Sequence, residues 1–134
     1  MLSGKKVMII DDSYADRREI KSILENEGAS VVEVTNGLGM HSLMEEYGEY
    51  VHLIIINIKL KHDNGFDLIQ ALKASRKYVE IPVMILSEFA NKESVLKAKE
   101  LEVSGYLKKP VQKDELMSRV NRILAENQQK PALE

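Results

Sequence analysis

Residues 53–60 read LIIINIKL, an apolar run that contains one amide side chain, Asn57. Consecutive leucine and isoleucine residues without polar alternation are typical of a strand covered on both faces, as the central strands of parallel sheets are. Ligands of such sheets bind beyond the carboxyl ends of the strands. The place of Asn57 near the end of this run therefore makes it a candidate functional residue.

Similar short runs occur along the whole chain and alternate with amphipathic stretches. The predicted strands are residues 6–10, 30–34, 51–56, 82–86 and 104–107. Ser13 and Asn91 are predicted helix N-caps, and Gly28 is predicted to follow the end of the first helix. Apolar residues recur three and four positions apart, as in helices, at Ile20, Ile23 and Leu24; Met40, Leu43 and Met44; Ile69 and Leu72; Val95, Leu96 and Leu101; Leu116, Val120, Ile123 and Leu124.

Five strand–helix units in succession predict an α/β fold. We expect a doubly wound, five-stranded parallel sheet of the flavodoxin-like type, with strand order 2-1-3-4-5 and helices on both faces. The length of 134 residues fits one domain, which we expect to span residues 1–127. The periodicity ends after Leu124, and residues 128–134 are predicted to be a flexible tail whose last two residues could be a cloning remnant.

The composition excludes several classes of function. The chain has no cysteine, which excludes disulfides, thiolate nucleophiles and zinc-thiolate sites. Its formal net charge of −2, with both signs interspersed, indicates neither nucleic-acid binding nor a membrane surface. No apolar run has the length of a signal peptide or a membrane span, so we expect a cytoplasmic protein. His41, His52 and His62 are not spaced as metal ligands.

Polar residues follow four of the predicted strands. Asp11 and Asp12 follow the first, Asn57 the third, Ser87 the fourth and Lys109 the fifth. Adjacent carboxylates suit a hard cation such as Mg²⁺, and a hydroxyl and an ammonium suit the oxygens of a phosphoryl group. This set predicts a phosphoryl site that lacks one component, a carboxylate nucleophile at position 57.

With these residues the sequence resembles the receiver domains of two-component response regulators, of which the chemotaxis regulator is a compact example. The resemblance covers residues 5–126. It implies that Asp11 and Asp12 hold Mg²⁺, together with the residue at position 57 and the backbone carbonyl of Lys59. It also implies that Ser87 and Lys109 contact the phosphoryl group.

The same resemblance implies a switch and a peptide-bond isomer. Ser87 and Tyr106 correspond to the residues that rearrange on activation. The bond between Lys109 and Pro110 is a candidate for the cis form, which is otherwise found in only about 5% of bonds before proline.

Two positions depart from the pattern of the family. The phosphoacceptor aspartate falls on Asn57, judged by its spacing to the acidic pair and to Asn64-Gly65, and the frequent proline four residues later is Lys61. Asp63 lies in the same loop, but we expect the loop to carry it away from the pocket, so it is not expected to be a substitute acceptor.

An amide at position 57 changes the expected chemistry. It has no anionic oxygen and is a poor nucleophile, so Asn57 is predicted not to be phosphorylated. Loss of its charge is expected to weaken Mg²⁺ binding. We expect the amide NH₂ to face a carboxylate of the acidic pair, its oxygen to face Lys109 or the metal, and Lys109 to be freer to pair with Asp12.

The sequence therefore favours a signalling module over an enzyme. The expected partners are a sensor histidine kinase or phosphotransfer protein, and a downstream effector or a fused output domain; a homodimer stays open. The module would act through binding surfaces around Tyr106 and the fourth and fifth helices. An alternative is a conventional phosphorylated response regulator in which the acceptor aspartate has been replaced.

Two other classes fit the residues less well. A flavodoxin-like cofactor-binding module needs a phosphate loop rich in Ser, Thr and Gly after the first strand, but residues 11–18 read DDSYADRR. A phosphatase with an aspartate nucleophile needs two aspartates separated by one residue, where this chain has Asp-Asp-Ser.

Overall fold

The computed structural model describes residues 2–128, in which five strands alternate with five α-helices and one 3-10 turn. The strands are β1 (Lys6–Ile10), β2 (Ser30–Val34), β3 (Leu53–Ile56), β4 (Val83–Ser87) and β5 (Gly105–Lys108). The helices are α1 (Tyr14–Asn26), α2 (Gly37–Tyr47), α3 (Gly65–Lys73), α4 (Lys92–Glu100) and α5 (Lys113–Gln128), and the 3-10 turn η1 covers Gly48–Tyr50.

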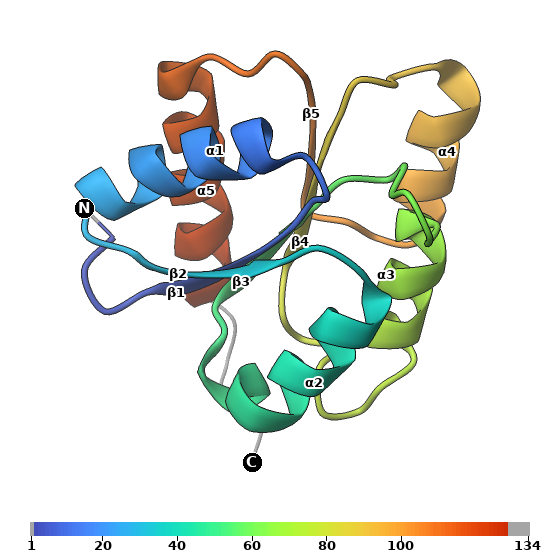
Figure 1. The fold of residues 1–134 in the computed structure, drawn as a ribbon, viewed down its shortest axis with the longest axis horizontal. Helices are drawn as coiled ribbons and strands as arrows, with labels where there is room; N and C mark the ends of the chain where they lie inside the picture. The colour runs from blue at the N-terminus through green and yellow to red at the C-terminus, as the bar shows by residue number, and fades with distance from the viewer. Residues whose placement is uncertain (1, 129–134) are drawn as a thin grey trace.

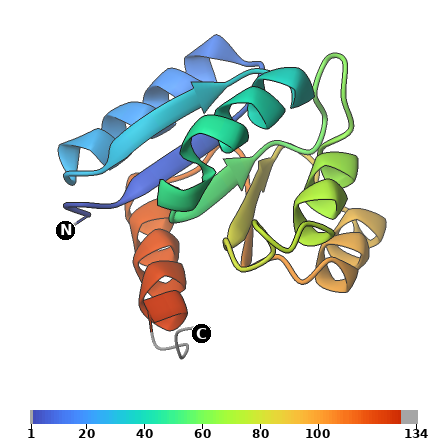
Figure 2. The same ribbon diagram turned by 90° about the horizontal axis from the view of Figure 1, so that it is seen from below.

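The five strands form one parallel sheet in the order β2-β1-β3-β4-β5, as predicted. Figure 1 shows α1 and α5 close together, with α2, α3 and α4 forming a separate group. The turned view in Figure 2 shows the strands lying between these groups. The predicted three-layer arrangement, with helices on both faces of the sheet, is therefore confirmed.

Alternating strand residues build two cores, one on each face of the sheet. Val7 and Ile9 of β1 pack in the cluster that contains the buried residues of α1 and α5. Met8 and Ile10 pack in the other cluster, with buried residues of α2, α3 and α4. All four residues of β3 are buried, because both faces of this central strand are covered.

Three strands differ from their predicted bounds. The expected strand over 51–56 begins at Leu53, because η1 occupies the residues just before Val51. The expected strand over 82–86 begins one residue later, since Pro82 has no N–H to donate to the ladder. The last strand is likewise one residue later than 104–107. Ser87 is therefore the last residue of β4 and does not follow it.

The helix ends predicted at Ser13, Gly28 and Asn91 agree with the structure. Ser13 and Asn91 cap α1 and α4 through their side chains, and Gly28 has a φ of 100° just after α1, which suits glycine. α5 continues to Gln128, past the expected end of periodicity at Leu124. The remainder of the predicted tail, residues 129–134, lies outside the described part of the chain.

α4 leaves exposed two of the three residues that the helical pattern indicated, Val95 and Leu96, while the third, Leu101, is partly buried against the core. Val95 is 36% exposed and Leu96 is 50% exposed, whereas Ala98 is the buried residue of this helix. Helical spacing shows which residues share a face, but it does not show whether that face is covered. α4 therefore carries an uncovered apolar face.

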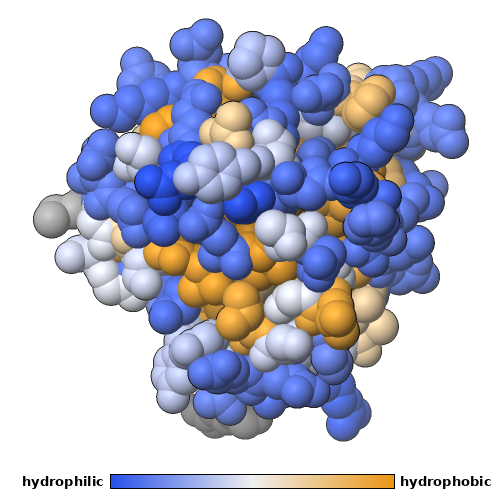
Figure 3. Space-filling model, in the orientation of Figure 1, coloured by the Kyte–Doolittle hydropathy of each residue, from blue (hydrophilic) through white to orange (hydrophobic). Residues whose placement is uncertain are grey.

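The surface is mostly hydrophilic on the side drawn in Figure 3, around a hydrophobic area near the centre of that side. Within residues 2–128, no helix combines the length and the apolar character that crossing a membrane requires.

Candidate functional site

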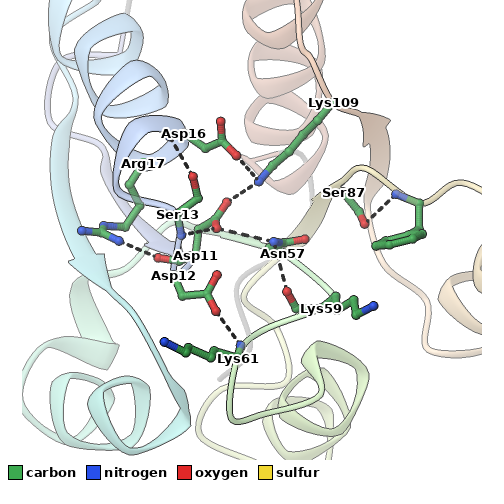
Figure 4. Close-up of polar contacts among 11 residues, drawn as sticks. Asp11, Asp12, Ser13, Asp16, Arg17, Asn57, Lys59, Lys61, Ser87 and Lys109 are labelled. Atoms are coloured by element: carbon green, nitrogen blue, oxygen red, sulfur yellow. Dashed lines mark hydrogen bonds and ion pairs between the residues drawn. The ribbon is translucent and has the colours of Figure 1, made fainter.

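The predicted polar residues meet beyond the carboxyl ends of the central strands. A cavity of about 290 Å³ lies there, lined by Asp12, Ser13, Asp16, Asn57, Lys59, Glu88, Phe89 and Lys109. Asp11 lies just behind this lining and is only 5% exposed. Figure 4 shows Asp11, Asp12, Asn57 and Lys109 approaching one another from the ends of β1 and β3 and from the segment after β5.

Asp11 is held at the end of β1, and its carboxylate accepts three hydrogen bonds. Its backbone N–H donates to the Val34 carbonyl at 3.0 Å. One carboxylate oxygen accepts from the Ser13 N–H at 2.9 Å and from Asn57 Nδ2 at 3.4 Å. The other oxygen accepts from Lys109 Nζ at 2.6 Å. This carboxylate is therefore buried but has partners on both oxygens.

Asn57 lies one residue past β3, where its backbone N–H donates to the Ile10 carbonyl at 2.9 Å. Its Nδ2 donates to Asp11 Oδ1 and to the Lys59 carbonyl, each at 3.4 Å. An amide nitrogen can only donate, and both partners can only accept, so the orientation of the amide is determined. The NH₂ faces the acidic pair, as expected.

Lys109 pairs with a residue that the sequence did not single out. Its Nζ lies 2.6 Å from Asp11 and 2.9 Å from Asp16, and its side chain is 9% exposed. The expected pairing with Asp12 is wrong, because α1 carries Asp16 to the ammonium. The Asn57 oxygen was expected to face Lys109 or the metal, and among the described residues it makes no hydrogen bond with Lys109. The Lys109-Pro110 bond is cis, as anticipated.

The ion pairs shift the protonation equilibria of this cluster. Burial disfavours the charged lysine, but the hydrogen bonds and charges of Asp11 and Asp16 outweigh it, so the pKa of Lys109 is raised. The hydrogen bond from Lys109 lowers the pKa of Asp16, against a smaller effect of burial. Lys109 and Asp16 are therefore both charged at neutral pH.

Asp12 is bound to the loop after β3. Its Oδ2 accepts a hydrogen bond from the backbone N–H of Lys61. Proline has no N–H, so the proline frequent at this position in the related sequences could not make this bond. The Lys61 N–H thus adds a hydrogen bond between the loop and the acidic pair.

Ser87 and Tyr106 both bind the backbone of Phe89. Ser87 Oγ accepts from the Phe89 N–H at 3.1 Å, and the Tyr106 hydroxyl donates to the Phe89 carbonyl. Burial raises the pKa of the Tyr106 hydroxyl. The two residues expected to form a switch are therefore linked through one residue of the β4–α4 loop.

Asp63 points to another part of the molecule. Its Oδ2 accepts from the backbone N–H of Gly37 at 2.9 Å, at the start of α2. The residue is absent from the lining of the cavity beside Asn57. This placement agrees with the expectation that the loop carries Asp63 away from the acidic pair.

Asp16, Glu88 and Phe89 also line the cavity, although sequence reasoning did not select them. The sequence did contain a pattern that could have indicated Asp16: this residue lies three positions after the N-cap Ser13, where a capping box places an acidic residue. Lys59 Nζ lies 5.1 Å from the centre of the Phe89 ring, a cation–π contact at the rim of the cavity. No pattern in the sequence predicts this contact between Lys59 and Phe89.

The oxygen donors present suit Mg²⁺ in kind but offer it few free charges. The carboxylates of Asp11 and Asp12 and the carbonyl of Lys59 are hard ligands. However, Lys109 already neutralises Asp11, and Asn57 directs its N–H groups toward Asp11 and the Lys59 carbonyl. Among the described residues, no group of three or more His, Cys, Asp or Glu side chains is arranged to hold a metal ion.

The response regulator receiver domain family matches residues 7–121. The chain therefore belongs to this family, whose members are signalling modules of two-component systems. This result confirms the resemblance found in the sequence.

Two curated relatives illustrate the similarity. The chain is 31% identical over 119 residues to the aerobic respiration control protein ArcA of Escherichia coli K12, a match that covers 89% of this chain and 48% of that protein. It therefore spans about half the length of that relative. It is 28% identical to a chemotaxis protein CheY homolog of Campylobacter jejuni, with 89% of this chain and 92% of that protein covered.

Solved structures support the same fold. A CheY-like receiver domain protein from Methanospirillum hungatei superimposes with a TM-score of 0.85 at 24% identity, covering 96% of this chain and 100% of that one. The receiver domain of a histidine kinase from Syntrophus aciditrophicus gives 0.84 at 24% identity, with 97% of each chain covered. The Mn²⁺-bound form of the response regulator Rcp1 gives 0.74 at 24% identity, covering 97% and 99%.

Proposed function

We propose that this chain is a receiver domain that signals without phosphorylation of its acceptor position, which is occupied by Asn57. The observation that carries this proposal is the hydrogen bond from Asn57 Nδ2 to Asp11 at the end of β1. A donor amide occupies the place where phosphotransfer requires an anionic nucleophile.

Phosphotransfer to a receiver forms one bond to phosphorus and breaks another. A carboxylate oxygen attacks the phosphorus atom of an acyl phosphate or phosphohistidine, the bond from phosphorus to the leaving group breaks, and the leaving group takes the electron pair. The neutral amide of Asn57 has no anionic oxygen for the attack. Asp63 does not replace it, because its carboxylate binds the start of α2.

We propose that the site binds Mg²⁺, but with an affinity reduced by the amide at position 57. Asp11 and Asp12, with the Lys59 carbonyl and the Asn57 side chain, would hold Mg²⁺, which supplies charge neutralisation to a phosphoryl group. Ser87 and Lys109 are the proposed contacts for that group. In the arrangement described, Ser87 Oγ accepts from the Phe89 N–H and Lys109 donates to two carboxylates, so contact with a phosphoryl group would have to compete with these bonds.

The proposed mode of action is protein binding. Phe89, Val95 and Leu96 are 43%, 36% and 50% exposed and lie on α4 and the loop before it. Together with Tyr106 they provide an apolar surface for an effector or an output domain. A sensor histidine kinase or phosphotransfer protein is the proposed partner on the input side, in the cytoplasm.

Phosphorylation by acetyl phosphate tests the proposal. We expect intact-protein mass spectrometry to detect no added phosphoryl group on the unaltered chain with Mg²⁺ present, and stoichiometric labelling of Asn57→Asp. Asn64→Asp, which makes the same chemical change at the N-cap of α3, should stay unlabelled. Mg²⁺-dependent labelling of the unaltered chain would overturn the proposal.

A second candidate is a conventional response regulator whose acceptor aspartate has been replaced. It is favoured by the presence of Asp11, Asp12, Ser87 and Lys109 in the same part of the molecule as Asn57. If Asn57→Asp is labelled by a phosphorylated histidine kinase as well as by acetyl phosphate, the site keeps the full ability to receive a phosphoryl group.

A further inference from the structure

We propose that Asp16 is a positioning residue that holds the Lys109 ammonium on the α1 side of the site, as the counter-ion that Asn57 does not supply. This inference rests on the proposed function, because it takes position 57 as the acceptor position. It assigns a role to a residue outside the acidic pair.

The geometry of the ammonium is the first support. Lys109 Nζ lies 2.9 Å from Asp16 Oδ2 and 2.6 Å from Asp11 Oδ2. Two of its three N–H donors are therefore used, and within the described residues it makes no bond to Asn57 or Ser87. Figure 4 shows the lysine reaching across to α1, with Nζ between the two aspartates.

The charge balance is the second support. The Lys109 side chain is 9% exposed, and a buried ammonium requires a nearby negative charge. Asn57 is neutral, and Asp12 binds the Lys61 N–H instead of Lys109. Asp16 is the carboxylate that joins Asp11 in neutralising the lysine.

The start of α1 explains why the Asp16 carboxylate is available. Ser13 Oγ accepts from the Asp16 N–H at 3.3 Å, as in a capping box. In that motif the third residue bonds back to the N–H of the cap. Here the Ser13 N–H donates to Asp11 Oδ1 at 2.9 Å, so Asp16 is released to bind Lys109.

A carboxylate at position 57 would therefore have to compete with Asp16 for the lysine. Transfer of Lys109 to a phosphoryl group would also require the ammonium to leave Asp16. Asp16 should thus stabilise the unaltered chain, in which position 57 is an amide, and slow the labelling of the Asn57→Asp variant.

The test compares Asp16→Asn with Glu19→Gln, each made in the unaltered chain and in Asn57→Asp. Glu19 lies one turn further along α1, is exposed, and has no ion pair in the described part of the chain. Urea unfolding measures how much the contact between Asp16 and Lys109 stabilises the fold, and it requires no phosphotransfer. We expect Asp16→Asn to lower the midpoint clearly in the unaltered chain and less in Asn57→Asp, whereas Glu19→Gln should have equal effects in both. Equal shifts from Asp16→Asn in the two chains would overturn the inference.

Labelling by acetyl phosphate is the second measurement. Asn57→Asp combined with Asp16→Asn should be labelled several-fold faster than Asn57→Asp alone, and the combination with Glu19→Gln should match Asn57→Asp. An unchanged or lower rate with Asp16→Asn would also overturn the inference. If Asn57→Asp takes no label at all, the proposed function fails, and the unfolding comparison still decides the role of Asp16.

Discussion

Asn57 Nδ2 lies 3.4 Å from Asp11 Oδ1, and the bond between them is one that two carboxylates could not make. A carboxylate at position 57 would place a second negative charge beside Asp11. At about 4 Å such a pair interacts by about 1 kcal/mol in water and about 4 kcal/mol at an effective dielectric constant of 20. If position 57 is the acceptor position, as proposed, the amide removes both the nucleophile and much of the attraction for a cation.

Restoring the charge should strengthen metal binding. We expect Asn57→Asp to lower the dissociation constant for Mg²⁺ about tenfold or more, which corresponds to at least ~1.4 kcal/mol. Isothermal titration calorimetry measures this change directly. Asn64→Asp adds the same charge at the N-cap of α3, where the side chain accepts from the Phe66 N–H, so its affinity should match that of the unaltered chain. A similar gain in both variants would mean that net charge, not position 57, controls the affinity.

Removing the ammonium should destabilise the fold. The side chains of Asp11 and Lys109 are 6% and 9% exposed, so Lys109→Met leaves a buried carboxylate without its counter-ion. We expect the free energy of unfolding to fall by about 3 kcal/mol. The exposed neighbour provides the control: Lys108→Met should change it by less than about 0.5 kcal/mol. Urea denaturation measures both values, and equal losses would contradict the importance of the buried pair.

Asp63 should matter for stability but not for phosphorylation. Its carboxylate accepts from the Gly37 N–H at the N-terminus of α2, so Asp63→Ala should lower the free energy of unfolding by about 1 kcal/mol. Asp63→Asn keeps an oxygen acceptor and should lose less. In the Asn57→Asp background, both variants should be labelled by acetyl phosphate at the parent rate. Loss of the label in either variant would instead place Asp63 in the phosphoryl site.

The fold could be predicted because each strand has a recognisable local sequence pattern. The run from Leu53 to Ile56 is apolar at every position, which fits a strand buried on both faces. The strand ends were less well predicted, since η1 and Pro82 shift the beginnings of β3 and β4. Whether the apolar face of α4 is covered depends on packing between distant elements, so the exposure of Leu96 could not be read from spacing.

The candidate site was predicted only where its residues lie at the carboxyl end of a strand or directly after it. Parallel strands end at one edge, so Asp11, Asn57, Ser87 and Lys109 could be brought together from their positions alone. Asp16 lies on a helix, and its contact with Lys109 depends on side-chain directions that the sequence does not specify. The Lys61 N–H bond to Asp12 depends on the path of a loop.

The last prediction concerns acid conditions and lies at the opposite ends of the strands. His52 Nδ1 accepts from the Lys6 N–H at 3.0 Å, which a protonated imidazole could not do. Burial, with the charges of Lys5 and Lys6, lowers the pKa of His52 below 6.5. Above this value both folded and unfolded chains hold a neutral imidazole. As the pH falls through it, the unfolded chain binds the proton first, so the free energy of unfolding decreases.

Urea denaturation at several pH values below 7 measures this loss. The unaltered chain should lose more stability on acidification than His52→Gln, whose side chain does not titrate in this range. His62 is exposed in the loop after β3, so His62→Gln should follow the unaltered chain. Identical pH dependence in the unaltered chain and His52→Gln would show that protonation of His52 does not oppose folding.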